Sequence, residues 1–333
     1  MTQSNTIDLS KLPAPDVVEP LDYETLFAQR KAELLTIMPE LADTLALESE
    51  PLTIQLQVSA YRELNLRQRI NQAAKSVMLA YAVDADLENL GALLGVPRLT
   101  LVEADPSANP PIEAVLESNT AYRERIQLSL DGLSTAGPEQ GYVYHARSAD
   151  PRVKDAKVDA PTFTRATLDP GVEATLPAGA IVLIPSYDAG LAEPSPGDVV
   201  ISVLSNNGDG TAPSDLLTAV ESAVNGEDTR PTTDHVIVQS ATIINYTVEA
   251  ELTIYPGPDG TTVLESAQQA VAAYVSDNHR LGRDITISGL HAALHKEGVQ
   301  NVALTAPVAD IEVSKSEAAY CTAIDITLGG TDE

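Results

Sequence analysis

The stretch DADLENLGALLGVPR, residues 84–98, decides how the N-terminal part of this chain folds. Leu87, Leu90 and Leu94 recur at intervals of three and four residues, the spacing that places side chains on one face of an α-helix. Gly95 is the residue type that ends a helix in a left-handed conformation. The stretch therefore predicts a short helix whose leucine face must be buried, either in the core of an all-α domain or against another chain.

Three acidic residues, Asp84, Asp86 and Glu88, alternate at the start of this helix. Alternating acids also occur in calcium loops, but such a loop needs a central glycine and a distant glutamate, and the leucine spacing requires a helix. We interpret Asp84 as the helix cap and the other two as first-turn charges favoured by the helix dipole.

Two more helices are predicted upstream. Residues 22–38 carry apolar side chains at helical spacing and stop before Pro39, and Ser49 with Pro51 marks the start of a second helix that continues to about Tyr81. A helix of about thirty residues is roughly 45 Å long, which is more than one small domain needs. Either the leucine helix folds back on it, or another chain covers the remainder.

The middle of the chain alternates between proline-rich gaps and short elements. Residues 99–118 contain three prolines and predict a linker with little structure of its own. Asn119 can cap a helix that continues to Leu130, residues 134–138 predict a turn, and Pro138 opens a second short helix. Residues 161–195 predict a β-rich insertion of two or three short strands.

The last third of the sequence reads as strand–helix–strand units in series. Such units build a small sheet with helices on one face. We therefore predict an α+β protein, with an N-terminal helical bundle segment followed by serial small α/β modules and a β-rich insertion. The expected parts are an extended arm (1–21), a helical domain (22–98), a linker (99–118), a mixed α/β module with the insertion (119–197), a first α/β module (198–242), and a second α/β module with a C-terminal strand (243–333).

The composition excludes several classes of partner. Among 333 residues, 48 are acidic and 20 basic, which gives a formal net charge of −28. Binding to nucleic acid or to anionic membranes needs clustered Lys and Arg, so we expect neither partner, and solubility is the simplest reason for so much acid. The N-terminus lacks a basic region followed by an apolar run, so we expect the protein to be made and kept in a cytoplasm.

Candidate catalytic and metal sites are weak. His291 and His295 lie four apart on a predicted helix, but Ala292 stands where a zinc protease has Glu, and no third ligand is near. The NNGDG stretch at 206–210 fits a tight turn without an ion. Cys321 is a lone cysteine and fits a small apolar residue in a strand. We expect no catalysis, no cofactor and no metal.

Several sequence segments, in this order along the chain, resemble those of the baseplate J family. Its members are the wedge proteins of contractile phage tails and phage-tail-like bacteriocins. The segments are DLENLGALLGVPR, AYRERI after a proline-rich gap, STAGPEQGYVYHARSADPRVKDAKV, TRPTTDHVIV and KEGVQNVALTAPVADI. The resemblance covers roughly residues 20–310. The chain departs from the family in the insertion, because the family's usual route from the VKDAKV strand to the next strand is shorter.

The resemblance implies a structural assembly protein. Its helices would join a bundle with a second copy of the chain and a neighbouring wedge protein, and its α/β modules would link wedges into a ring around the tail tube. Its neighbours would be tail protein I-like and sheath-initiator-like proteins. They would meet in the baseplate of a virion or tail-like particle that is made in the cytoplasm of a bacterial host. The ring would hold the baseplate and pass its opening to the sheath, with linkers such as 99–118 absorbing the change.

Six apolar residues are the candidates for this assembly. They are Tyr61, Ile70, Val77, Leu87, Leu90 and Leu94. Each of them fits burial within one chain equally well.

Two other functions stay open. The first is a virion-attached adhesin or host-recognition protein, built on the insertion at residues 160–197. The second is a glycan-cleaving enzyme that uses a pair of acidic residues. The chain has eleven Tyr, two Phe and no Trp, so it is poor in the aromatic platforms that sugar sites use, and the missing export signal also counts against both.

Overall fold

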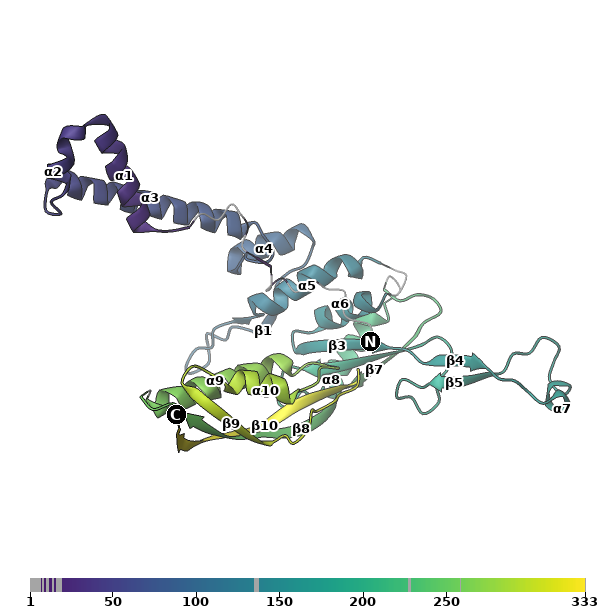
Figure 1. Ribbon diagram of the computed structural model, residues 1–333. Helices are drawn as coiled ribbons and strands as arrows, with labels where there is room; N and C mark the ends of the chain where they lie inside the picture. The colour runs from purple at the N-terminus through teal and green to yellow at the C-terminus, as the bar shows by residue number, and fades with distance from the viewer. Residues whose placement is uncertain are drawn as a thin grey trace. The chain divides into compact units, whose positions relative to one another are not determined.

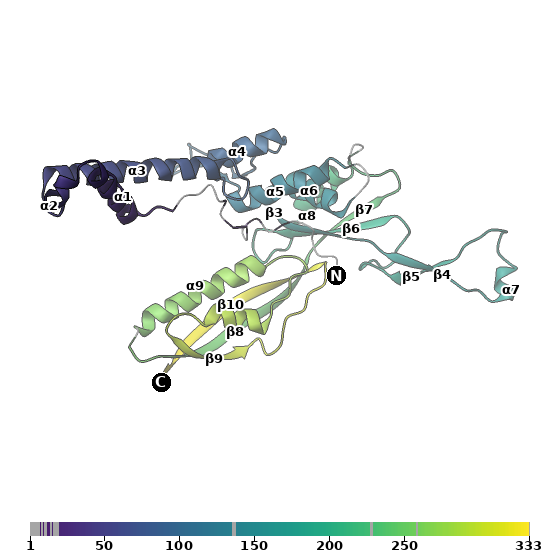
Figure 2. The ribbon, with the colours of Figure 1, turned by 45° about the horizontal axis from the view of Figure 1, so that its top comes forward.

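The computed structural model describes residues 7, 9, 12, 13, 15, 20–134, 138–226, 229–257 and 259–332. Its elements are drawn in Figures 1 and 2. The chain divides into two compact units: a helical unit, residues 1–98 and 118–127, and a sheet unit, residues 99–117 and 128–333. Helices and strands together confirm the predicted α+β class.

The helical unit contains the helices that the N-terminal sequence predicts. They are α1 (Tyr23–Ile37), a 3-10 turn (Pro39–Leu41), α2 (Ala42–Leu45), α3 (Pro51–Ser76), α4 (Asp84–Leu93) and the first turns of α5 (Asn119–Gly132). The Asp22 carboxylate caps α1 by accepting the N–H groups of Glu24 and Thr25. The long helix α3 begins at Pro51 as expected and ends five residues before Tyr81.

Asp84 and Asn119, the predicted cap residues of α4 and α5, bond to each other. Gly95 has φ +70° and ends α4 as predicted, but the N-cap of α4 is Val83, and Asp84 lies in the first turn with φ +47°. Asn119 bonds to Asp84 instead of capping α5, while the Ser118 hydroxyl accepts the Ala121 N–H. Both cap predictions were wrong because these side chains find partners 35 residues apart in sequence.

The expected linker, residues 99–118, is a small hairpin. Strands β1 (Thr100–Val102) and β2 (Val115–Leu116) pair antiparallel. Glu117 closes their base: its N–H donates to the Leu99 carbonyl at 2.9 Å and its carboxylate accepts the Leu99 N–H at 3.2 Å. Most of the segment lies outside these two strands, and their pairing is a feature that the local sequence did not predict.

The first three-stranded sheet has the order β3-β6-β7, from β3 (Val153–Asp159), β6 (Asp198–Ser205) and β7 (His235–Ser240). Helix α8 (Ser214–Val224) connects β6 to β7, which run parallel, and α6 (Glu139–Ala149) packs with α8 on the apolar face. Because β3 precedes residue 198, the sheet crosses the expected boundary between the mixed module and the first α/β module.

The second sheet has the order β10-β8-β9, from β8 (Thr242–Ile254), β9 (Val299–Ala306) and β10 (Glu317–Thr331). Helices α9 (Gly260–Asn278) and α10 (Ile287–Leu294) pack on its core face. Strand β9 runs antiparallel to β8, and β10 runs parallel to β8 over its whole length. The two modules thus share a layer arrangement, and in each sheet the central strand has one parallel and one antiparallel neighbour.

The insertion forms two strands and one short helix. Strand β4 (Thr162–Arg165) pairs antiparallel with β5 (Leu183–Tyr187), and α7 (Pro170–Glu173) lies in the loop between them. Every residue of β5 is exposed, and no residue from 162 to 187 belongs to a cluster of buried core residues. The hairpin (Figure 1) therefore confirms the β-rich insertion and contributes little to the core.

Most of the predicted arm, residues 1–21, and residues 135–137 of the predicted turn lie outside the described residues. At the described positions the arm is held through its main chain. The Tyr81 hydroxyl donates to the carbonyls of Leu12 and Pro13 at 2.9 and 2.6 Å, and the Gln127 amide donates to the Ile7 carbonyl at 3.1 Å. The side chains of Ile7 and Leu12 are exposed.

Removal of the insertion hairpin tests its independence. Thr162 and Tyr187 are paired in register, so a two-residue Asn-Gly turn can join them in place of residues 163–186. We expect the free energy of unfolding to change by less than about 0.5 kcal/mol, as for surface changes outside the core. Urea unfolding of the shortened chain measures this, and a loss of several kcal/mol would contradict the exposed state of β5.

Candidate assembly surface

Helix α3 exposes its large apolar side chains. Those at least one third exposed along it and at its C-cap are Ile54, Val58, Tyr61, Leu66, Ile70 and Val77, and the exposed fraction reaches 59% for Tyr61 and 69% for Val77. A helix of a self-sufficient globular domain places such residues on its buried face. These six residues form what we call the α3 surface.

The side of α3 that is buried carries small and polar residues. Thr53, Ala60 and Asn71 are the buried residues of the helix. Helix α1 packs against α3, and an ion pair between Arg30 and Glu63 connects the two helices. The polar face of α3 is thus covered by its own chain, and the apolar face is left open.

The α3 surface consists of two stripes. Ile54, Val58 and Tyr61 follow one another at spacings of four and three residues, and Leu66 and Ile70 repeat the four-residue spacing. The step of five residues from Tyr61 to Leu66 turns the second stripe by roughly 140° from the first, at 100° per residue. The two stripes therefore face different directions, and one partner helix cannot cover both.

Glu63 organises the contact between α1 and α3. Its carboxylate accepts hydrogen bonds from Arg30 on α1 and from Arg67 one turn further along α3, the latter at 2.8 Å. The hydrogen bond from Arg30, and after it that from Arg67, holds the pKa of the Glu63 carboxyl below its ordinary value. This network joins α1 to α3 at Glu63.

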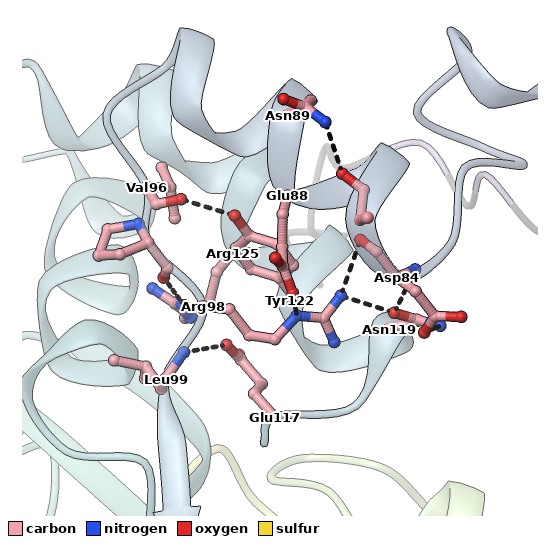
Figure 3. A network of polar contacts seen from close by, with 12 residues as sticks. Asp84, Glu88, Asn89, Val96, Arg98, Leu99, Glu117, Asn119, Tyr122 and Arg125 are labelled. Atoms are coloured by element: carbon pink, nitrogen blue, oxygen red, sulfur yellow. Dashed lines mark hydrogen bonds and ion pairs between the residues drawn. The ribbon is translucent and has the colours of Figure 1, made fainter.

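Helix α4 is oriented by a polar network that Figure 3 shows. Arg98 reaches Glu88 with its Nε at 3.0 Å from the carboxylate and donates through Nη2 to the Asn119 side-chain oxygen at 2.7 Å. Asn119 in turn accepts the N–H of Asp84 and donates to its carboxylate, both at 3.1 Å. The network ties Asp84 and Glu88 of α4, through Arg98, to the start of α5.

Tyr122 of α5 packs directly against α4 and requires a glycine there. Its hydroxyl donates to the Val96 carbonyl at 2.7 Å. A Cβ on Gly91 would lie 2.0 Å from this hydroxyl, so only glycine admits the ring so close to the helix. Arg98 lies over the Tyr122 ring, with its guanidinium carbon 4.8 Å from the centroid.

Two further arginines of α5 donate hydrogen bonds to backbone carbonyl groups in the loops before and after α4. Arg123 donates to the carbonyls of Leu79 and Ala82, both at 2.6 Å, and the buried Arg125 donates to the Pro97 carbonyl at 2.7 Å. Burial lowers the pKa of the Arg123 guanidinium. The loops on both sides of α4 are therefore fixed by donors from α5.

The six residues predicted for assembly have different surroundings. Tyr61, Ile70, Val77 and Leu94 are exposed, and Leu90 is half-buried. Leu87 is fully buried within the helical unit, so its packing is satisfied by its own chain and we leave it out of the surface. The structure adds Leu93, which is 80% exposed, and the three members of the α3 surface that the sequence analysis did not single out, Ile54, Val58 and Leu66.

The remaining candidates from the sequence are possible metal ligands. Within the described parts of the chain, no group of three or more His, Cys, Asp or Glu side chains is arranged to hold a metal ion. His291 lies on α10, and His295 is its C-cap. None of the described helices is long and apolar enough to cross a membrane.

Comparison with known proteins identifies the class. Residues 48–105 match the model of the baseplate J-like N-terminal domain, and residues 246–327 match that of the baseplate J-like C-terminal domain. Together with the relative described next, these matches confirm the resemblance that the sequence predicts. The chain belongs to the baseplate J-like family.

A full-length relative is baseplate protein J of Escherichia phage P2. It is 46% identical over 332 residues, covering 98% of this chain and 99% of that protein. A chain of the cryo-EM structure of the anti-feeding prophage baseplate aligns with a TM-score of 0.37 and 16% identity, covering 65% of this chain and 44% of that one. The second likeness is too distant to bear on fold or function.

Gly91→Ala tests the close approach of Tyr122. The added methyl would overlap the Tyr122 hydroxyl, so the ring must move and lose its bond to the Val96 carbonyl. We expect a loss of about 2 kcal/mol in the free energy of unfolding. The control is Gly171→Ala, whose Cβ would meet open space; equal effects of the two variants on urea unfolding would contradict the packing described.

Glu63→Gln tests the link between α1 and α3. The pKa of Glu63 is lower in the folded chain, so its contribution to stability is present above the ordinary value of 4.5 and is lost as the pH falls below it. We expect the variant to cost up to about 1 kcal/mol at pH 7, because the pair is partly exposed, and less at pH 3, below the ordinary pKa of 4.5. Urea unfolding at both pH values measures this, and the exposed Glu33→Gln is the control.

Proposed function

We propose that this chain is a structural wedge component of a contractile-tail baseplate. Membership of the baseplate J-like family, with a relative named for the baseplate, supports the baseplate role. The observation that carries the wedge assignment is the α3 surface, an apolar helix face left open by the chain itself. The protein acts by holding other proteins in place, at the baseplate of a virion or tail-like particle made in a bacterial host.

The helical unit supplies the assembly contacts. Complete burial of an exposed side chain of the size of leucine contributes about 1.5–3 kcal/mol. The six residues of the α3 surface are 44–69% exposed, so covering them favours a helix–helix interface. Because the two stripes of the α3 surface face different directions, they suit two partner helices at once. One partner is a second copy of this chain and the other is a neighbouring, tail protein I-like wedge protein.

The sheet unit links wedges into a ring and meets a sheath-initiator-like protein. Two layered modules give it broad outer faces for contacts with proteins on several sides. A ring built in this way holds the baseplate in its ready state and passes its opening to the sheath. The change in the ring is a change of packing between subunits, the kind of bistable contact that serves such transitions.

Ile70→Asp tests the α3 surface. Ile70 is half exposed in the chain, so we expect the free energy of unfolding of the isolated protein to change by less than about 0.5 kcal/mol. A charge at the centre of an apolar interface is costly to bury, so the complex formed on co-expression with the proteins encoded next to this chain should be lost. Light scattering of the purified complex measures its mass.

The matched control is Gln29→Asp, which adds the same charge to an exposed position of α1, outside the α3 surface. We expect this variant to assemble like the parent chain, with a fixed stoichiometry that includes two copies. Normal assembly by Ile70→Asp would exclude the α3 surface as the interface. A stable monomer of the parent chain in the presence of both neighbours would exclude the wedge assignment itself.

A further inference from the structure

The central strand of the first sheet is buried on both faces. Every residue of β6 except Val199 is buried. Successive side chains of a strand point to opposite faces of the sheet. Ile201 and Val203 belong to the core cluster under α6 and α8, whereas Leu204 belongs to a different cluster on the other face. The face without helices is therefore also covered.

The second module covers this face. Leu204 packs in one cluster with Leu281 from the loop after α9 and Ala318 from the start of β10. A Cβ on Gly210, in the turn after β6, would come within 2.9 Å of the His279 ring, so this ring also lies close to the first sheet. His279 is buried, and burial lowers the pKa of its imidazole. Its Nδ1 lies 2.8 Å from the Ala319 carbonyl.

The backbone passes from one sheet to the other through a single residue. Strand β7 ends at Ser240 and β8 begins at Thr242. The intervening Ala241 donates its N–H to the Val203 carbonyl in the first sheet at 2.8 Å, and Thr242 donates to the Ser316 carbonyl in the second module at 2.9 Å. No flexible connection separates the two modules at this point.

Asp155 connects the modules at the opposite edge of the first sheet, on strand β3. The pairing of β3 with β6 shifts register between Val153 and Asp155, and such irregularities turn a side chain in a new direction. The buried Asp155 carboxylate accepts the Leu281 N–H at 3.1 Å with one oxygen and the Ala156 N–H at 2.9 Å with the other. A buried carboxylate is costly unless it is hydrogen-bonded, and here one bond comes from the second module.

We infer that the two sheets form one rigid body, fastened by Asp155, and that this body transmits movement in the baseplate without bending between its modules. The rigid body follows from the contacts above, and only its role in transmission rests on the proposed function. Lys315 adds an ion pair to Asp159 across the same junction, at 3.2 Å. Movement during baseplate opening then occurs outside the two sheets.

Hydrogen exchange of the full chain tests the fastening. In Asp155→Ala the Leu281 N–H loses its acceptor, so we expect amide exchange in residues 279–282 and 315–319 to rise at least tenfold, with the cores of both sheets unchanged. The control is Asp325→Ala, which removes an exposed carboxylate from β10. If Asp155→Ala does not fold, Asp155→Asn keeps one acceptor oxygen, and a smaller rise in the same two segments is expected. Unchanged exchange there overturns the fastening.

A cross-link tests transmission. Leu281 and Ala318 face each other in an antiparallel bridge, where Cα atoms lie about 4.5–5.5 Å apart, within the range of a disulfide. Leu281→Cys with Ala318→Cys, in a Cys321→Ser background, locks the modules together on oxidation. We expect particles that carry the locked chain to contract as often as reduced ones. Contraction only after reduction overturns the rigid lever, whereas absence of the chain from particles overturns the proposed function and leaves the exchange result standing.

Discussion

Burial of β6 on both faces is the constraint on which the sheet unit depends. A strand with one wet face can alternate apolar and polar residues, but a strand covered on both sides must be apolar or hydrogen-bonded throughout. The only polar residues of β6, whose sequence is DVVISVLS, are Asp198, Ser202 and Ser205. The Asp198 carboxylate accepts the Ser195 N–H and lies 2.8 Å from the His235 ring nitrogen. Helices occupy one face and the second module the other, so each layer is held by the strand between them.

The helical unit follows the opposite principle. In its longest helix, α3, the buried residues are small or polar, and large apolar side chains are exposed. Its internal order comes from hydrogen bonds and ion pairs, with Arg98, Arg123 and Arg125 binding main-chain and side-chain oxygens around α4. Leu26, Leu45, Leu87 and Tyr122 are buried in this unit, whereas the apolar residues of the α3 surface are exposed. The contrast fits a protein with a rigid part and an assembling part.

Local patterns predicted the elements well and their partners poorly. The leucine spacing gave α4, and Gly95 gave its end, because both depend on a few neighbouring residues. The leucine spacing did not predict that Leu87 is buried in its own chain while Leu94 is exposed. Periodicity defines one face of a helix, but it does not show which residues pack against that face. The cap role of Asp84 failed because Asn119 competes for it over 35 residues.

The junction of the two modules could be predicted only in part. The largely apolar run VVISVL at residues 199–204 is visible in the sequence and is typical of a buried strand. The role of Asp155 was not visible, because it depends on a register shift and on Leu281, 126 residues further along the chain. The hairpin at 99–118 was missed for a similar reason, since the pairing of Thr100 with Leu116 joins segments that look unstructured when read alone.

The way in which the N-terminal arm is held has a consequence for how such a protein can evolve. Tyr81 and Gln127 grip carbonyl groups that every residue type provides. The anchor therefore places no demand on the identity of Ile7 or Leu12, whose side chains point to solvent. A lineage of these proteins can change the side chains of its arm to follow a changing neighbour, and the arm stays fastened at the same place throughout.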